Sequence, residues 1–263
     1  MENKNKLKLS VIIPAHNEEE NIGSTVTSII PKLEAEQIPF ELIVVNDNST
    51  DRSLEVLQEL AKAYKTIRIV SRTPPNGFGR AVRSGLASFN GDVVMIVMAD
   101  LSDDPSDIVK YYRKIEDGYD CVFGSRFLKA STVKEYPAVK LLVNRIVNKM
   151  LQFLFLTGHN DLTNAFKAYR ADVIHSIMPL QASHFNITIE ISLSALIRGY
   201  KTCQVPINWY GRKWGSSKLS LRSMGRRYLA TLTKIWFERL LIMDDLMTEV
   251  VPPKKDATTV IKD

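Results

Sequence analysis

Carboxylate, amide and hydroxyl side chains follow several apolar segments of this chain, and the most informative of them is Asp100. Residues 93–98 are apolar and have the length of a buried strand, and Asp100 comes shortly after them. Pro105 then suits the first turn of a helix. Open sheets of parallel strands bind ligands beyond the carboxyl ends of the strands, where Asp100 is expected to lie. A carboxylate there is typical of a site for a hard divalent cation that bridges a diphosphate.

Two more polar segments also follow predicted strands. Residues 14–18 come after the strand predicted over 9–13, and residues 46–51 come after the strand predicted over 40–45. The second segment alone is equally typical of a turn with a helix cap. Because the carboxyl ends of parallel strands share one edge of the sheet, the three segments together predict one polar crevice.

The elements that would position these residues alternate along the first half of the chain. Apolar runs predict strands over residues 9–13, 40–45, 67–70, 93–98 and 119–124. Helical spacing predicts helices over 18–36, 51–64, from 79 onward and over 105–116, with Pro31 expected to kink or split the first. Repeated strand–helix units of this length predict an α/β fold, with a mostly parallel sheet flanked by helices on both faces.

The second half of the chain predicts two amphipathic helices. Residues 138–156 carry one narrow polar stripe beside a wide apolar arc, which fits either a core helix or a helix in the membrane interface. Residues 221–246 mix basic with aromatic and aliphatic residues, which favours the interface. We expect one domain over 7–220 that includes the helix 138–156, then the basic amphipathic helix over 221–246 and a disordered tail over 247–263.

Composition is that of an ordinary globular protein, with 45% hydrophobic and 24% charged residues. Cys121 and Cys203 form neither a CxxC pair nor a zinc-ligand spacing, which favours a reducing compartment. The polar start of the chain argues against a signal peptide, and no apolar stretch reaches the roughly 18 residues of a spanning helix. We therefore expect a soluble or peripheral protein.

The net charge of +6 is unevenly distributed. Basic residues are frequent between Arg198 and Arg239, where Glu238 is the only acidic residue. Contact with phosphates of a substrate or of anionic lipid is one explanation, and a solvated basic face is another. Nucleic acid is not expected as a partner, because the segment contains no recognised DNA- or RNA-binding motif.

The motifs of this chain, taken in order, resemble those of family 2 glycosyltransferases, which have the GT-A fold. Pro14–Glu18 resembles the family's P-x-x-N-E opening, and Val44–Asp51 resembles its V-D-D-x-S-x-D turn. Asn76–Arg80 with Gly85 resembles its N-x-G-x-[GA] loop, and Gly124–Arg126 resembles its G-S-R motif. Asp161–Arg170 resembles the family's D-x-x-S-G-F-R-A-[YF]-R motif, and Arg212–Lys218 resembles its R-x-x-G-x-S-K motif. The last two motifs are typical of the polyprenyl-phosphate branch, to which dolichol-phosphate mannosyltransferases belong.

The resemblance implies roles for residues on the donor side of the site. Asp47 would read the nucleotide base. The nucleotide pocket would also include Pro14, His16, Glu18 and Arg80. The predicted cofactor is Mg²⁺ or Mn²⁺, which Asp100 would hold against the donor diphosphate. Ser102 stands where a glutamine often helps to bind that metal.

The resemblance also implies a set of phosphate-binding residues. Arg126, Arg212 and Lys218 would act in catalysis by holding the phosphates of donor and acceptor, since a guanidinium suits this task through its bidentate fork. Ser217 would hydrogen-bond the acceptor phosphate. An alternative for Arg126 and Arg212 is pairing with acidic residues at the surface.

One departure from the family pattern affects the metal site. Met98 stands where the family usually has another aspartate. Because Mg²⁺ often uses one or two protein carboxylates with phosphates and water, Asp100 alone would suffice. Asp103 or Asp104 would either add a ligand or cap the helix that follows.

Together these features predict an inverting glycosyltransferase at the cytoplasmic face of a membrane. It would move a sugar from a nucleotide sugar, GDP-mannose or a UDP-sugar, to a polyprenyl phosphate such as dolichyl or undecaprenyl phosphate. A membrane-anchoring partner subunit is a further expectation. The alternatives are a saccharide acceptor on a cell-surface polymer and a non-catalytic membrane-bound subunit whose metal site decayed at Met98. We expect Glu190 and His159 to be structural.

Overall fold

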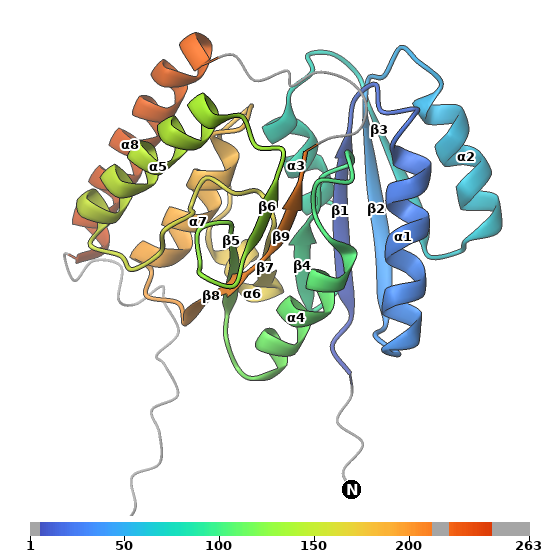
Figure 1. Ribbon diagram of the computed structural model, residues 1–263, viewed down its shortest axis with the longest axis horizontal. Helices are drawn as coiled ribbons and strands as arrows, with labels where there is room; N and C mark the ends of the chain where they lie inside the picture. Colours follow the sequence, from blue (N-terminus) through green and yellow to red (C-terminus); the bar gives the residue numbers. More distant parts are fainter. Residues whose placement is uncertain (1–5, 212–220, 244–263) are drawn as a thin grey trace, which may run out of the picture.

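The computed structural model describes residues 6–211 and 221–243 and centres on a seven-stranded sheet (Figure 1). The strand order is β3-β2-β1-β4-β7-β5-β8. Its strands, in chain order, are β1 (Leu9–Ala15), β2 (Phe40–Asp47), β3 (Ile67–Arg72), β4 (Val93–Ile96), β5 (Cys121–Ser125), β7 (Lys167–Arg170) and β8 (Thr202–Pro206). A small parallel sheet pairs β6 (Thr132–Lys134) with β9 (Asn208–Tyr210).

Helices cover both faces of the large sheet. They are α1 (Ile22–Ala35), α2 (Ser53–Ala63), α3 (Phe78–Leu86), α4 (Pro105–Glu116), α5 (Ala138–Phe155), α6 (Ala171–Ser176), α7 (Ile187–Ile197) and α8 (Leu221–Met243). One buried apolar cluster joins the sheet to α1, α2 and α4, and a second joins it to α3, α6, α7 and parts of α5 and α8. Alternate residues of β1 divide between the two clusters, as expected for a strand buried on both faces. The predicted α/β class is therefore confirmed.

The strand β7 was not predicted, and it changes the topology of the sheet. It lies between β4 and β5 and runs antiparallel to both, whereas the other neighbouring strands of the large sheet are parallel. Its four residues, Lys167–Arg170, are too short and too polar to show a strand pattern in the sequence. This insertion brings the segment 161–166 to the same edge as the ends of β4 and β5.

Several predicted boundaries are wrong by a few residues. β1 continues through Pro14 to Ala15, because pairing with β4 ends at Ile12 and no partner there needs the missing N–H of proline. α1 begins at Ile22 rather than at residue 18, and it passes through Pro31 as one helix. β4 ends at Ile96 rather than at residue 98, so the two residues before Asp100 belong to a loop.

The helix α5 turns only part of its polar stripe toward the protein, since Arg145 and Lys149 are exposed. Asn148 is buried, accepts a hydrogen bond from the Leu162 backbone N–H at 2.7 Å and donates to the Thr163 hydroxyl at 3.0 Å. Most of the apolar arc faces outward, and Val139 and Phe153 are 70% and 79% exposed. The core-helix alternative is therefore wrong for most of this arc, although its last turns contribute Leu151 and Phe155 to the core.

The helix α8 lies beside α5 and also exposes apolar side chains (Figure 1). Leu232 and Ile235 pack into the core, while the exposed large hydrophobic residues among the described side chains of this helix are Leu229, Trp236, Phe237, Leu240 and Leu241. The Arg239 guanidinium donates to the Leu154 carbonyl at 3.3 Å and so joins the two helices. Among the described helices, none is both long and apolar enough to cross a membrane.

Candidate functional site

The loops after β1 and β2 interlock at the edge of the sheet. The Asn17 backbone has a φ of 54°, and its side-chain oxygen accepts from the Thr50 N–H at 2.8 Å. The Asn17 N–H in turn donates to the Ser49 hydroxyl at 3.0 Å. Asp51 accepts from the Ser53 N–H at the start of α2, but the N-cap residue of this helix is Arg52, whose side chain makes no capping hydrogen bond. These contacts fix both loops on one side of a shared cavity.

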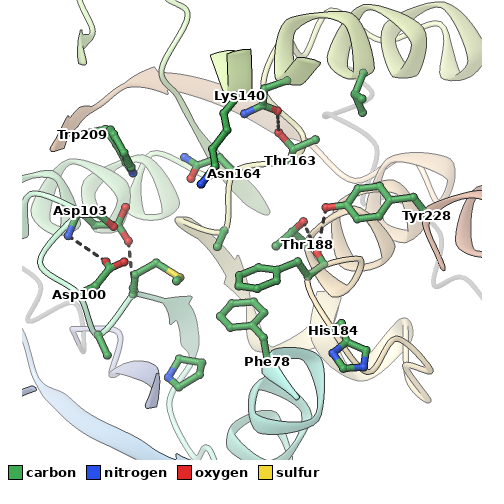
Figure 2. A pocket seen from close by; sticks show the side chains of 18 of the residues that line it. Phe78, Asp100, Asp103, Lys140, Thr163, Asn164, His184, Thr188, Trp209 and Tyr228 are labelled. Atoms are coloured by element: carbon green, nitrogen blue, oxygen red, sulfur yellow. Dashed lines mark hydrogen bonds between the residues drawn. The ribbon is translucent and has the colours of Figure 1, made fainter. Parts of the chain in front are cut away.

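The cavity has a volume of about 1060 Å³ and runs from the strand ends to α5 and α8. Figure 2 shows the carboxylates of Asp100 and Asp103 on one wall, Lys140 and Asn164 on another, and His184 and Tyr228 on a third. Its lining includes seven of the predicted site residues: Pro14, His16, Glu18, Asp47, Asp100, Ser102 and Arg126.

The remaining predicted site residues are not placed on the cavity. Arg80 is not among its lining residues, and its guanidinium donates to the Asn76 carbonyl at 2.9 Å, within the loop before α3. Arg212, Ser217 and Lys218 lie outside the described residues.

Asp47 is buried and joins neighbouring loops at the strand-end side of the cavity. Its carboxylate accepts from the Gly77 N–H at 2.7 Å and pairs with the Arg72 guanidinium. Its backbone carbonyl lies 2.9 Å from His16 Nδ1. Gly77 itself has no room for a side chain, because a Cβ there would lie 2.3 Å from the Ser183 carbonyl oxygen. The close packing of the loop before α3 against the segment that contains Ser183 therefore depends on glycine at position 77.

The loop after β4 presents two buried carboxylates to the cavity. Asp100 accepts from the Ser102 N–H at 3.2 Å, in a turn where Leu101 has a φ of 60°. Asp103 accepts from the Met98 N–H at 3.1 Å. Burial is the main cause that raises the pKa of Asp103 to about 7, and the negative charge of Asp100 adds to this increase. Asp104 instead caps α4 by accepting from the Ser106 N–H at 2.9 Å.

These residues fit a divalent cation of the Mg²⁺ or Mn²⁺ type. Two oxygen ligands from nearby carboxylates, with room left for phosphate and water, match what Mg²⁺ takes from a protein. Two acids buried together also favour a cation that offsets their charge. No group of three or more histidine, cysteine, aspartate or glutamate side chains that would hold a metal occurs in the described part of the chain. A divalent cation at this site would therefore be held by few protein ligands, and phosphate and water would complete its coordination.

Arg126 is paired with a buried acid, not with an acid at the surface. Its Nε and Nη2 donate to the two carboxylate oxygens of Asp161 at 2.8 and 2.7 Å, and its backbone N–H donates to the same carboxylate at 2.9 Å. Both side chains are buried. Nη1 points toward the Tyr136 hydroxyl at 3.4 Å on the cavity wall. Most of the guanidinium is thus committed to positioning the 161–166 segment.

The far wall of the cavity contains residues that the sequence did not single out. Tyr136, Lys140 and Asn144 line it, and the Asn144 amide donates to the Tyr136 hydroxyl at 2.9 Å. The apolar part of this wall comes from α5 and α8, through Val143, Val147, Met150, Leu229 and Leu232. Lys140 and Asn144 are four residues apart and both belong to the predicted polar stripe. This spacing was the only feature of the sequence that indicated that they share one face of the helix.

Phe78 and Phe185 line the cavity and stack with ring centroids 4.6 Å apart. The 181–186 segment that carries Phe185 is held by Glu190, whose buried carboxylate accepts from the Ala182 N–H at 2.7 Å. Lys234 of α8 contacts the same carboxylate at 2.8 Å. Glu190 therefore links α7, α8 and this segment, in agreement with its predicted structural role.

The sequence model of Glycosyl transferase family 2 matches residues 10–178. This chain therefore belongs to glycosyl transferase family 2, as the motifs indicated.

Among characterised relatives, the chain is 33% identical over 217 residues to a dolichol-phosphate mannosyltransferase of Pyrococcus furiosus. That match covers 81% of this chain and 59% of the relative, so the chain spans about three fifths of the relative's length. It is also 29% identical over 216 residues to a polyprenol monophosphomannose synthase of Mycolicibacterium smegmatis, with 80% of each chain covered.

Solved structures show the same fold. Glucosyl-3-phosphoglycerate synthase from Mycobacterium tuberculosis, crystallised with Mn²⁺, UDP and phosphoglyceric acid, has a TM-score of 0.67 and 24% identity. The match covers 88% of this chain and 78% of that one. A crystal structure of the same synthase with Mg²⁺ and UDP has a TM-score of 0.66 and 22% identity, covering 88% and 80%.

Proposed function

We propose that this protein is an inverting glycosyltransferase that moves a sugar from a nucleotide sugar to a polyprenyl phosphate. The observation that carries the proposal is the continuity of one cavity. Its polar end has buried carboxylates at the strand ends, and its apolar end lies between two helices with exposed hydrophobic faces. A nucleotide sugar suits the first end, and a lipid with a phosphate head suits the second.

The donor would occupy the edge of the sheet. Asp47, His16, Pro14 and Glu18 lie together there, where open α/β sheets bind nucleotides. The diphosphate would then reach the loop of Asp100. A divalent cation bound by Asp100 and its neighbours would supply positive charge to offset that of the leaving diphosphate. GDP-mannose and UDP-sugars are both candidate donors, and the names of the two relatives favour the mannosyl donor.

The acceptor phosphate would lie between the donor and the helices α5 and α8. Lys140 and the Nη1 of Arg126 line this part of the cavity and would bind it. Arg212, Ser217 and Lys218 are proposed as additional phosphate ligands from outside the described residues. The apolar wall from α5 and α8 would contact the first part of the lipid chain.

The reaction needs no strong protein base. A phosphate monoester is largely dianionic near neutral pH, because its second pKa is about 6. One of its oxygens attacks the anomeric carbon and forms the new C–O bond. The bond from that carbon to the donor diphosphate breaks, and its electron pair leaves with the nucleoside diphosphate. The protein's main tasks are to align two anionic partners and offset their charge.

We further propose that the enzyme works at the cytoplasmic face of a membrane. The exposed apolar side chains of α5 and α8 lie beside basic ones, a composition that suits an interfacial helix. Both relatives are named for polyprenol- or dolichol-linked products. A membrane-anchoring subunit would add to this attachment.

Extraction of the reaction product tests the proposal. The protein is incubated with Mn²⁺, undecaprenyl or dolichyl phosphate and each of a panel of radiolabelled GDP- and UDP-sugars. We expect label in the organic phase with one preferred donor. Label that appears in a water-soluble saccharide instead would support the saccharide-acceptor alternative. No product with any donor, together with nucleotide binding that does not respond to Mn²⁺, would favour the non-catalytic alternative.

A further inference from the structure

The first unusual feature of the metal-site loop is the side chain at position 98. Met98 lines the cavity two residues before Asp100, where a second carboxylate is expected from the family motif. A thioether is a soft ligand, whereas Mg²⁺ and Mn²⁺ prefer oxygen. Met98 therefore leaves the loop with one carboxylate fewer than the motif would provide.

The second feature is the position of the Asp103 side chain. The left-handed conformation of Leu101 reverses the chain after Asp100, and Asp103 then returns toward the end of β4. One of its carboxylate oxygens lies 3.1 Å from the Met98 backbone nitrogen. The turn thus brings a carboxylate from position 103 next to the backbone of residue 98, and Figure 2 shows it close to that of Asp100.

The third feature is the environment of this carboxylate. Asp103 is 5% exposed, and among the described side chains of residues 6–211 and 225–242 it has no ion-pair partner within 4.0 Å. The nearby Arg126 is instead in a bidentate pair with Asp161. A buried carboxylate is costly unless a cation or several donors offset its charge. Since Asp103 lines the cavity, a cation bound there would offset the negative charge of its carboxylate.

From these three features we infer that Asp103, together with Asp100, holds the divalent cation, and that Asp103 supplies the carboxylate that position 98 lacks. This inference rests on the proposed function, because it assumes that the site takes a metal. It assigns the second carboxylate to Asp103 and not to its neighbour. Asp104 caps α4 through Ser106, and its other oxygen accepts from the Asn208 amide at 3.2 Å.

Direct measurement of Mn²⁺ binding tests the inference without any turnover. The full chain, without nucleotide, is titrated with Mn²⁺, and free Mn²⁺ is counted by its electron paramagnetic resonance signal. Asp103→Asn keeps an oxygen that accepts from the Met98 N–H but loses the charge, so a merely structural role would survive it. We expect Mn²⁺ affinity to fall at least about tenfold, since even indirect partners of metal ligands produce losses of that size.

Asp104→Asn is the matched control, because it makes the same charge change one residue away and asparagine is an equally good helix cap. It is expected to keep wild-type Mn²⁺ affinity. Equal Mn²⁺ affinity in Asp103→Asn and the wild type would overturn the inference and leave the proposed function intact. Absence of Mn²⁺ binding by the wild type, both without nucleotide and with GDP or UDP present, would overturn both. Thermal unfolding of each variant shows that the comparison is made between folded proteins.

Discussion

The Asp100 carboxylate has a local structural contact as well as its proposed role toward the metal. It accepts from the Ser102 N–H at 3.2 Å, within the turn that follows β4. Asp100→Asn keeps an oxygen for this contact and removes only the charge. We expect turnover to fall at least about hundredfold, the cost of losing one preorganised electrostatic group at a reacting centre. Steady-state kinetics and thermal unfolding measure the two effects separately, and near-normal turnover would refute the metal role.

The pair between Arg126 and Asp161 is the strongest candidate for a stabilising contact near the site. Both side chains are buried and the contact is bidentate. Asp161→Asn leaves a buried guanidinium without its counter-charge, so we expect a loss of about 3–5 kcal/mol in unfolding free energy. Denaturant unfolding measures it. Arg52→Gln, which breaks an exposed pair with Glu55, is the control and should cost no more than about 1 kcal/mol.

His159 predicts a pH dependence of stability that is separate from catalysis. Burial, with a smaller contribution from the Lys167 cation, lowers the pKa of His159 to about 4. Below its ordinary pKa of 6.5, His159 binds a proton in the unfolded chain but not in the folded chain, so the contribution of this group to stability falls as the pH drops from 6.5 to 4.

The variant His159→Gln should remove this contribution, which is at most about 1.4 kcal/mol per pH unit for one group. Denaturant unfolding at several pH values within this window measures the slope. An unchanged slope in the variant would contradict the assignment to His159.

At the scale of the elements, the sequence predicted the strands and helices that carry strong periodic patterns. The helix 105–116 has its predicted limits because Pro105 and the Asp104 cap mark its start unambiguously. β7 escaped prediction because four partly polar residues become a strand only through their neighbours. The orientation of α5 also escaped, since a polar stripe by itself does not show whether it faces water or buried backbone groups.

The exposed faces of α5 and α8 predict binding to lipid vesicles. The double variant Phe153→Glu with Phe237→Glu places two charges on these faces, at side chains that are 79% and 58% exposed. Sedimentation with vesicles that contain anionic lipid should show at least about tenfold weaker binding, because charge replaces apolar area that would enter the interface. Met178→Glu, at an exposed apolar residue outside both helices, is the control. Unchanged sedimentation of the double variant would exclude these faces as the attachment surface.

At the scale of the whole molecule, the site could be predicted only in part. The strand-end residues Asp47 and Asp100 were found because the position after a parallel strand is informative by itself. Tyr136, Lys140 and Tyr228 reach the same cavity from distant segments, and their convergence depends on how α5 and α8 pack. Arg80 is not among the residues that line the cavity, and its guanidinium donates to the Asn76 carbonyl.

The central claim is that one cavity brings a nucleotide sugar to a lipid phosphate. The most direct measurement compares polyprenyl phosphate with the corresponding polyprenol as acceptor, using the preferred labelled donor and Mn²⁺. Transfer of label to the organic phase with the phosphate, and none with the alcohol, is the predicted result, because the phosphate is both nucleophile and ligand of the basic side chains. Equal transfer to both acceptors, or transfer to neither with the label in a water-soluble glycan, would contradict the claim.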